Sequence, residues 1–142
     1  MWLKLDTTYK LGYMVVSSVP RHFNMNDNLF LGIDGGLYFY VHGDDVRYDY
    51  INGAIEKIGD TNFYYYCEGP RTMLKNIGNV YFYTEYRYHG EKYSKIGSSY
   101  LYYDIEHKDR VSKIGDHNIY YDYNNRVNQI DSNYIYDNGY SY

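Results

Sequence analysis

The sequence repeats itself with a period just under 20 residues, and this repeat limits the folds that the chain can adopt. Each copy has an isoleucine before a turn, and five residues later an apolar residue followed directly by tyrosine. The isoleucines are Ile58, Ile77, Ile96, Ile114 and Ile130, spaced by 19, 19, 18 and 16 residues. The apolar residues are Phe63, Phe82, Leu101, Ile119 and Ile135. A repeat this short predicts similar supersecondary units arranged side by side.

Each unit is expected to contain two strands. The first strand is rich in tyrosine, and in residues 119–123 the odd positions point to one face and the even positions to the other. The second strand is shorter and basic, as in Arg126–Ile130. A glycine follows most of the isoleucines, and polar turns such as Asn52-Gly53 join the two strands. The sequence therefore predicts an all-β fold, an antiparallel meander of about a dozen strands in an open or curled sheet.

A second set of apolar residues lies three positions before each isoleucine. These residues are Ile55, Leu74, Tyr93, Val111 and Val127. In a regular strand, residues three apart lie on opposite faces, so that one member of each pair would be exposed. A β-bulge, or an early entry of the chain into the glycine turn, would place both members on the same face.

The repeat divides the chain into two regions. Residues 46–142 form the tyrosine-rich repeat region, and residues 1–45 are less regular. Within residues 1–45, "YKLGYMVVSSV" predicts one or two strands, and "PRHFNMNDN" predicts a loop around Pro20. Because repeat arrays need atypical ends, we expect residues 1–45 to form an N-terminal cap and the first strands. With 142 residues, both regions belong to one continuous domain.

Composition and charge exclude several classes of function. Tyrosine accounts for 24 of the 142 residues, and the net charge is −4. The negative charge argues against nucleic-acid binding, because phosphate contacts need clustered lysine and arginine. No apolar run approaches the roughly 18 residues of a membrane-spanning helix. The first residues do not resemble a signal peptide, so the chain is expected either to stay in the cell or to be the mature form of a surface or secreted protein.

The tyrosines that follow the second apolar residue of each unit are the candidate ligand-binding residues. They are Tyr64, Tyr83, Tyr102, Tyr120 and Tyr136. If the tyrosine strands come into register, these rings lie in a row about 9–10 Å apart, which suits the stacking of sugars or other flat ligands. Alternatively, the rings cover the sheet and pack across strands. In that arrangement Lys95, Lys113, Arg110 and Arg126 would pair with Asp104 and Asp122.

No catalytic or metal site is predicted. His42, His89, His107 and His117 fall in or beside turns, and a metal site would require several turns to converge at one edge. We expect these histidines to be exposed polar residues. The single cysteine, Cys67, excludes an internal disulfide and is expected to pack as a small apolar residue. Because no catalytic motif is present, we expect neither enzyme activity nor a cofactor.

Residues 114–130, "IGDHNIYYDYNNRVNQI", resemble the YD repeat of Rhs-type and related bacterial surface and toxin-delivery proteins. The shared features are a Tyr-Asp pair, a short polar turn, an arginine, an aliphatic residue and a nearby isoleucine. Residues 100–115 and 46–59 match less completely, so the resemblance covers residues 46–142 at most. It implies a long β strip, of which this chain would supply a fragment. A weaker similarity to choline- and glucan-binding repeats carries over no binding residues, because Trp2, the only tryptophan, lies outside the repeat.

Two classes of function remain after these exclusions. The first is a structural or interaction module from a bacterium, which binds a protein partner or a second copy through a sheet edge or its aromatic face. The second is a carbohydrate-binding module that stacks sugars on exposed tyrosines. A binding platform needs the repeated tyrosines exposed on a concave surface, whereas a structural sheet buries them or pairs them with charged residues.

Overall fold

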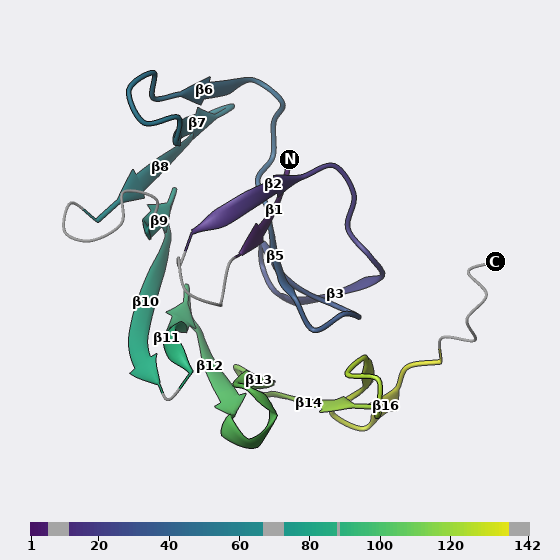
Figure 1. Cartoon of the computed structure of the whole chain (residues 1–142). Coiled ribbons are helices and arrows are strands. Elements are labelled where there is room, and N and C mark those ends of the chain that lie inside the picture. Colours follow the sequence, from purple (N-terminus) through teal and green to yellow (C-terminus); the bar gives the residue numbers. More distant parts are fainter. Residues whose placement is uncertain (6–11, 67–72, 88, 137–142) are drawn as a thin grey trace.

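The computed structural model describes residues 1–5, 12–66, 73–87 and 89–136. These residues form two antiparallel sheets (Figure 1). A five-stranded sheet, here called the inner sheet, has the order β2-β1-β5-β4-β3, and an 11-stranded sheet, the long sheet, runs in sequence order from β6 to β16. Neither sheet is closed, so the prediction of an all-β antiparallel meander with an open or curled sheet is confirmed.

The strands are short, and one 3₁₀ turn, η1 (Ile105–His107), interrupts the long sheet. The inner sheet consists of β1 (Trp2–Leu5), β2 (Tyr13–Val16), β3 (His22–Asn26), β4 (Leu29–Gly32) and β5 (Leu37–Tyr40). The long sheet consists of β6 (Val46–Tyr48), β7 (Ile55–Ile58), β8 (Thr61–Tyr65), β9 (Leu74–Ile77), β10 (Val80–Arg87), β11 (Gly90–Ile96), β12 (Ser99–Asp104), β13 (Arg110–Ile114), β14 (His117–Tyr121), β15 (Val127–Ile130) and β16 (Asn133–Tyr134).

A β-bulge in the second strand of each unit explains how the second set of apolar residues reaches the core. Between β10 and β11, Tyr83 pairs with Lys95 but the next residue, Thr84, pairs with Tyr93, so one residue of β11 is skipped. The short strands β7, β9, β13 and β15 skip one residue in the same way. Because of the bulge, Tyr93 and Ile96 both face the core, with exposed fractions of 0% and 2%. Of the two possibilities, the bulge is the correct one.

The turn after each isoleucine depends on a residue with positive φ. Gly59, Gly78, Gly97 and Gly115 have φ values between +56° and +60°. Glycine is favoured there because it alone adopts this backbone conformation without steric cost from a side chain. In the last described unit Asp131 takes the glycine position, with a φ of +56°.

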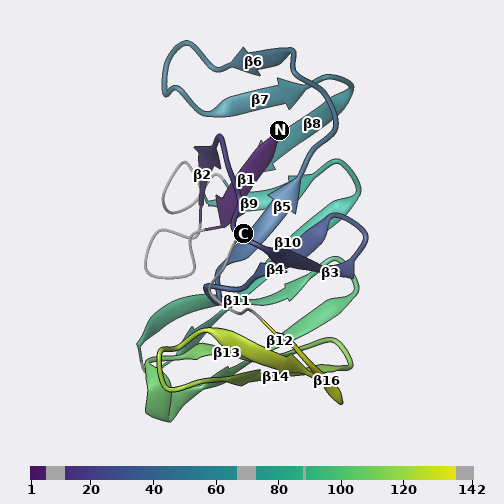
Figure 2. The ribbon, with the colours of Figure 1, turned by 90° about the vertical axis from the view of Figure 1, so that its right-hand side faces the viewer.

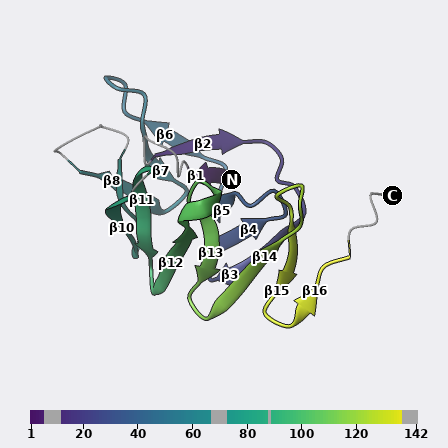
Figure 3. The same ribbon diagram turned by 60° about the horizontal axis from the view of Figure 1, so that its bottom comes forward.

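Neighbouring units are staggered by two residues, and this stagger makes the long sheet coil. Phe63 pairs with Ile77, and Ile77 pairs on its other side with Val80 rather than with Phe82, the residue equivalent to Phe63. The later units repeat the same step. One residue of stagger per strand also occurs in closed eight-stranded barrels, whose strands tilt by about 36°. Here the sheet stays open and curves around the inner sheet (Figures 1 and 3).

The inner sheet fills the concave face of the long sheet. Figure 2 shows it lying in front of successive strands of the long sheet, on the open side of the curve. The two sheets share one hydrophobic core, in which the rings of Phe39 (β5) and Phe82 (β10) lie 5.7 Å apart between centroids. A backbone hydrogen bond from Val127 N to Ile33 O (2.9 Å) joins the two sheets near the C-terminal end. All five inner strands come from residues 2–40, within the region expected to be atypical.

The prediction of a loop at residues 20–28 is wrong. Residues His22–Asn26 form β3, which pairs with β4 along the edge of the inner sheet. Met25 is buried, and Phe23 packs partly against the core. Three polar residues with weak strand propensity, His22, Asn24 and Asn26, alternate with these apolar residues and hide the pattern in the sequence.

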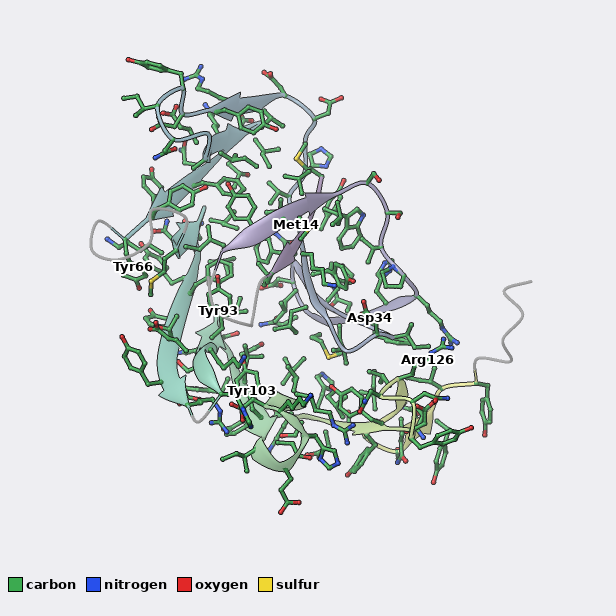
Figure 4. All side chains as sticks on the ribbon, in the orientation of Figure 1. Met14, Asp34, Tyr66, Tyr93, Tyr103 and Arg126 are labelled. Atoms are coloured by element: carbon green, nitrogen blue, oxygen red, sulfur yellow. The ribbon has the colours of Figure 1, made fainter. Side chains whose placement is uncertain are left out.

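Inward-facing tyrosines link three of the units to the unit that precedes each of them. The hydroxyl groups of Tyr65, Tyr103 and Tyr121 donate to backbone carbonyl oxygens ten residues earlier. The acceptors are Ile55, Tyr93 and Val111, the apolar residues that lie beside the bulges. The side chains of Tyr93 and Tyr103 lie on the core side of the long sheet (Figure 4). These hydroxyl groups add side-chain hydrogen bonds to the backbone beside the bulges, where the regular ladder is disturbed.

Candidate binding surface

Four of the repeated tyrosines, Tyr64, Tyr83, Tyr102 and Tyr120, lie on the outer, convex face of the long sheet, opposite the core. Each follows a buried apolar residue in its strand, so the pleat turns its ring to solvent, whereas Tyr136 lies beyond the end of β16. The exposed fractions are 50% for Tyr64, 46% for Tyr83, 49% for Tyr102, 48% for Tyr120 and 79% for Tyr136. The rings are therefore exposed, as a binding surface requires, but the face that carries them is convex rather than concave (Figure 1).

Because of the stagger, these tyrosines do not form a straight row across the sheet. Each is shifted along the strand direction by two residues relative to the one in the preceding unit. Along the hydrogen-bonding direction, Tyr64 is followed by Asn76 and then by Tyr81. In the next unit Tyr83 is followed by Lys95 and then by Tyr100. The tyrosines two residues earlier in β10 and β12, Tyr81 and Tyr100, thus belong to the same surface, with exposed fractions of 45% and 53%.

Lysines lie between the tyrosine rings of the outer face. The Lys95 Nζ lies 4.7 Å from the ring centroid of Tyr100 and 5.6 Å from that of Tyr83. The Lys113 Nζ lies 5.5 Å from the centroid of Tyr102. These distances are typical of cation–π contacts. In two of the three Lys-Ile-Gly copies, those of Lys95 and Lys113, the lysine therefore packs against aromatic rings of an adjacent strand.

The expected pairs of Lys95 and Lys113 with Asp104 or Asp122 do not form. Lys95 and Lys113 take part in none of the ion pairs among the described residues. Asp104 and Asp122 instead accept backbone N–H groups in the turns that follow them, from Glu106 and from Asn124 and Arg126 respectively. This Asx-turn geometry explains why a tyrosine strand of this type ends in aspartate.

Four grooves line the edge of the long sheet that carries the glycine turns, within the described part of the chain. Each lies between two consecutive turns, and strands of the inner sheet form its floor. We name them by their turns. The Gly59–Gly78 groove has a volume of about 540 Å³, the Gly78–Gly97 groove about 20 Å³, the Gly97–Gly115 groove about 390 Å³ and the Gly115–Asp131 groove about 270 Å³. The repeat therefore forms a series of equivalent sites that differ in size and lining.

Two of the histidines, His107 and His117, each pair with one aspartate. His107 Nδ1 lies 2.7 Å from Asp104 Oδ2, and His117 Nδ1 lies 2.8 Å from Asp131 Oδ2. The hydrogen bond from each histidine lowers the pKa of its aspartate partner. Across residues 1–5, 12–66, 73–87 and 89–136, no three His, Cys, Asp or Glu side chains are grouped as metal ligands. Cys67 lies outside the described residues.

Sequence reasoning missed one charged pair. Asp109 has a fully buried side chain, and its Oδ1 lies 3.4 Å from the Nε of Arg87, close enough for an ion pair but not aligned as a hydrogen bond. The guanidinium of Arg87 also lies over the ring of Tyr103, 5.2 Å from the centroid. The positive φ of Asp109, +58°, brings its carboxylate under the sheet, which no sequence motif indicates. This pair joins β10 to the turn before β13.

In comparisons with known proteins, no family model matches the sequence, and neither a curated protein nor a solved structure gives a significant match. Within the described residues, no helix has the length and apolar character needed to cross a membrane.

Proposed function

We propose that this chain is a non-enzymatic β-repeat module that binds a protein partner through the outer tyrosine face. The observation that carries the proposal is the combination of half-exposed tyrosines with lysines that lack carboxylate partners among the described residues. Tyrosine provides a large, rigid contact area and is enriched among the residues that dominate protein interfaces. The lysines favour a partner surface that carries carboxylates.

The outer face is a better docking surface than the sheet edges. The edge strands β6 and β16 contain three and two residues, so each offers few free backbone groups to an added strand. The concave face is covered by the inner sheet. The convex face, in contrast, extends over all units of the long sheet, and a partner that binds it does not need to displace any part of the fold.

The resemblance of residues 46–142 to YD repeats supports the same class of function, a bacterial β-repeat module with a structural or interaction role. The resemblance adds no binding residues of its own. The tyrosine face is proposed from the exposure of its rings and from their contacts with lysine.

The proposal is tested with two triple variants that change composition equally. The face variant replaces Tyr83, Tyr102 and Tyr120 with serine. The control variant replaces Tyr50, Tyr86 and Tyr123 with serine. These three tyrosines lie toward the edge of the long sheet opposite the glycine turns, with exposed fractions of 94%, 87% and 95%. Each protein is immobilised, proteins from an extract of the source cells are captured, and the captured proteins are quantified by mass spectrometry.

We expect one or more proteins to be captured by the parent and by the control variant but lost from the face variant. Circular dichroism must show that all three proteins keep the same sheet content. Equal capture by the two triple variants would exclude the outer face as the interface.

A further inference from the structure

The Gly97–Gly115 groove presents hydrogen-bond donors in fixed positions. The side-chain nitrogen of Asn26 donates to Ser98 Oγ at 2.9 Å and to Ser99 Oγ at 3.0 Å. Each serine hydroxyl therefore acts as an acceptor and keeps its own proton for another partner. Neither hydroxyl has a further hydrogen bond within the described residues. The wall formed by Ser98 and Ser99 thus carries two O–H groups that can donate to a ligand.

A cation lies on the facing side of the same groove. Lys113 lines it, and its ammonium group is held against the ring of Tyr102 without an ion-pair partner among the described residues. An ammonium group and two hydroxyl groups that line one cavity favour an anionic acceptor, because charge-assisted hydrogen bonds are stronger than neutral ones. A carboxylate fits this donor set.

The remaining lining fits a sugar ring. Tyr100 and Tyr102 present half-exposed rings, which offer apolar faces to the C–H groups of a pyranose. Asp116 is exposed, makes no ion pair with a described residue and can accept hydrogen bonds from sugar hydroxyl groups. The volume of about 390 Å³ lies within the usual range for small-molecule sites. We propose that this groove binds a carboxylate-bearing sugar, the uronic-acid class, as one residue of an acidic glycan.

The other grooves lack this combination. In the Gly59–Gly78 groove, Asn76 takes the repeat position of Lys113, and the lining contains Asp60 but neither lysine nor arginine. The Gly78–Gly97 groove, with about 20 Å³, holds little more than a water molecule. In the Gly115–Asp131 groove the same position is Gln129, and the Asp131 carboxylate is occupied by His117. Of these four equivalent sites, the lysine and the two serines occur together in one.

This inference goes beyond the protein partner proposed above and does not depend on it. The groove takes a single sugar residue at the turn edge, whereas the partner would cover the convex face. Tyr102 and Lys113 border both surfaces, so the test of the groove uses a small soluble probe and reports on the groove directly.

The experiment is a nuclear magnetic resonance titration of the ¹⁵N-labelled chain with glucuronate, glucose and acetate as separate probes. We expect glucuronate to shift the backbone amide signals of Ser98, Ser99 and Gly115 in a saturable manner. Glucose and acetate each contain only part of the recognised chemistry, so we expect them to bind at least about tenfold more weakly.

Two lysine variants give a matched comparison. Lys113→Gln should weaken glucuronate binding by about tenfold or more and leave the response to glucose unchanged. Lys57→Gln changes the same repeat position in another unit, at a lysine that neither lines the Gly97–Gly115 groove nor contacts its tyrosines, and should leave glucuronate binding unchanged. Ser98→Ala, at an exposed position, should weaken glucuronate binding by several-fold through loss of one donor.

Several results would overturn the proposal. Acetate binding as tightly as glucuronate would leave a small-anion site and no sugar site. An equal effect of Lys57→Gln and Lys113→Gln would assign the response to general charge. Signal changes confined to another groove, or no response to any probe, would exclude the Gly97–Gly115 groove as an acidic-sugar site.

Discussion

The two faces of the long sheet use tyrosine in two different ways, and the comparison is clearest where the residues are adjacent in sequence. Tyr102 and Tyr103 are neighbours, yet Tyr102 is 49% exposed on the convex face and Tyr103 is 8% exposed in the core. The Tyr103 hydroxyl donates to the carbonyl oxygen of Tyr93, whereas the Tyr102 ring contacts the Lys113 ammonium. The pairs Tyr64–Tyr65 and Tyr120–Tyr121 repeat this division. In each Tyr-Tyr pair, the first ring thus covers the outer surface, and the second tyrosine faces inward and donates a hydrogen bond to the backbone of the preceding unit.

The largest difference between the two faces is expected from removal of a whole ring. Tyr103→Ala should lower the free energy of unfolding by about 3–5 kcal/mol, because it opens a cavity in the core. Tyr102→Ala removes the same side chain from the outer face and should cost less than about 1 kcal/mol. Urea unfolding followed by circular dichroism measures both values. Similar losses in the two variants would show that the outer ring is also a packing residue.

The second-largest effect is expected from alkaline pH, which should lower the free energy of unfolding through the tyrosines of the inner face. Burial, as the main cause, raises the pKa of Tyr65, Tyr103 and Tyr121 above the usual tyrosine value. Above about pH 10 the unfolded chain releases these protons while the folded chain keeps them, so stability falls as pH rises. Each phenol contributes up to about 1.4 kcal/mol of this loss at about pH 11.

A phenylalanine variant checks the contribution of one phenol. Tyr103→Phe removes one group with a raised pKa, so the loss of stability between about pH 9 and pH 11 should be smaller than in the parent. The measurement is urea unfolding at a series of pH values. An identical pH dependence in the parent and in Tyr103→Phe would mean that this phenol ionises equally in both states.

The repeat made the outer face of the long sheet predictable. The alternation of apolar residue and tyrosine correctly placed Tyr64, Tyr83, Tyr102 and Tyr120 opposite the buried residues. A further signal was present but not used, since a tyrosine follows the anchor isoleucine by seven residues in three units, at Tyr65, Tyr103 and Tyr121. These tyrosines find their acceptors, the backbone carbonyl groups ten residues earlier, because of the bulge and of the stagger between units. Pairing registers of this kind depend on backbone geometry that a single sequence does not specify.

The inner sheet and the grooves were less accessible from the sequence. Residues 1–45 carry no repeat, so nothing in them indicates that β1 to β5 occupy the concave face, and the loop predicted around Pro20 is wrong because β3 lies there. The grooves require both sheets, because the turn residues of the long sheet form their walls and residues such as Asn26 form their floor. A site built from segments about 75–90 residues apart appears only when the packing of the two sheets is known.

Removal of single hydroxyl groups should have an intermediate effect. Tyr103→Phe at neutral pH removes the hydrogen bond that the phenol donates to the Tyr93 carbonyl oxygen and should cost about 1–2 kcal/mol. Tyr102→Phe removes a hydroxyl group that makes no hydrogen bond with a described residue and should change stability by less than about 0.5 kcal/mol. The two urea unfolding curves are compared directly. A greater loss from Tyr102→Phe would contradict the division of roles between the two faces.

The smallest expected effect concerns the lysines of the outer face. Lys95 contacts two rings, so Lys95→Gln should lower the free energy of unfolding by about 0.5–1 kcal/mol through loss of the cation–π contacts. Lys57 occupies the same repeat position but lies opposite Asn62 and Arg47, with no aromatic ring in cation–π contact among the described residues, so Lys57→Gln should have almost no effect. Because both variants remove one positive charge, the difference between them isolates the aromatic contact from the net charge. Equal effects of the two substitutions would mean that the lysines stabilise the sheet through charge alone and that the outer tyrosines do not depend on them.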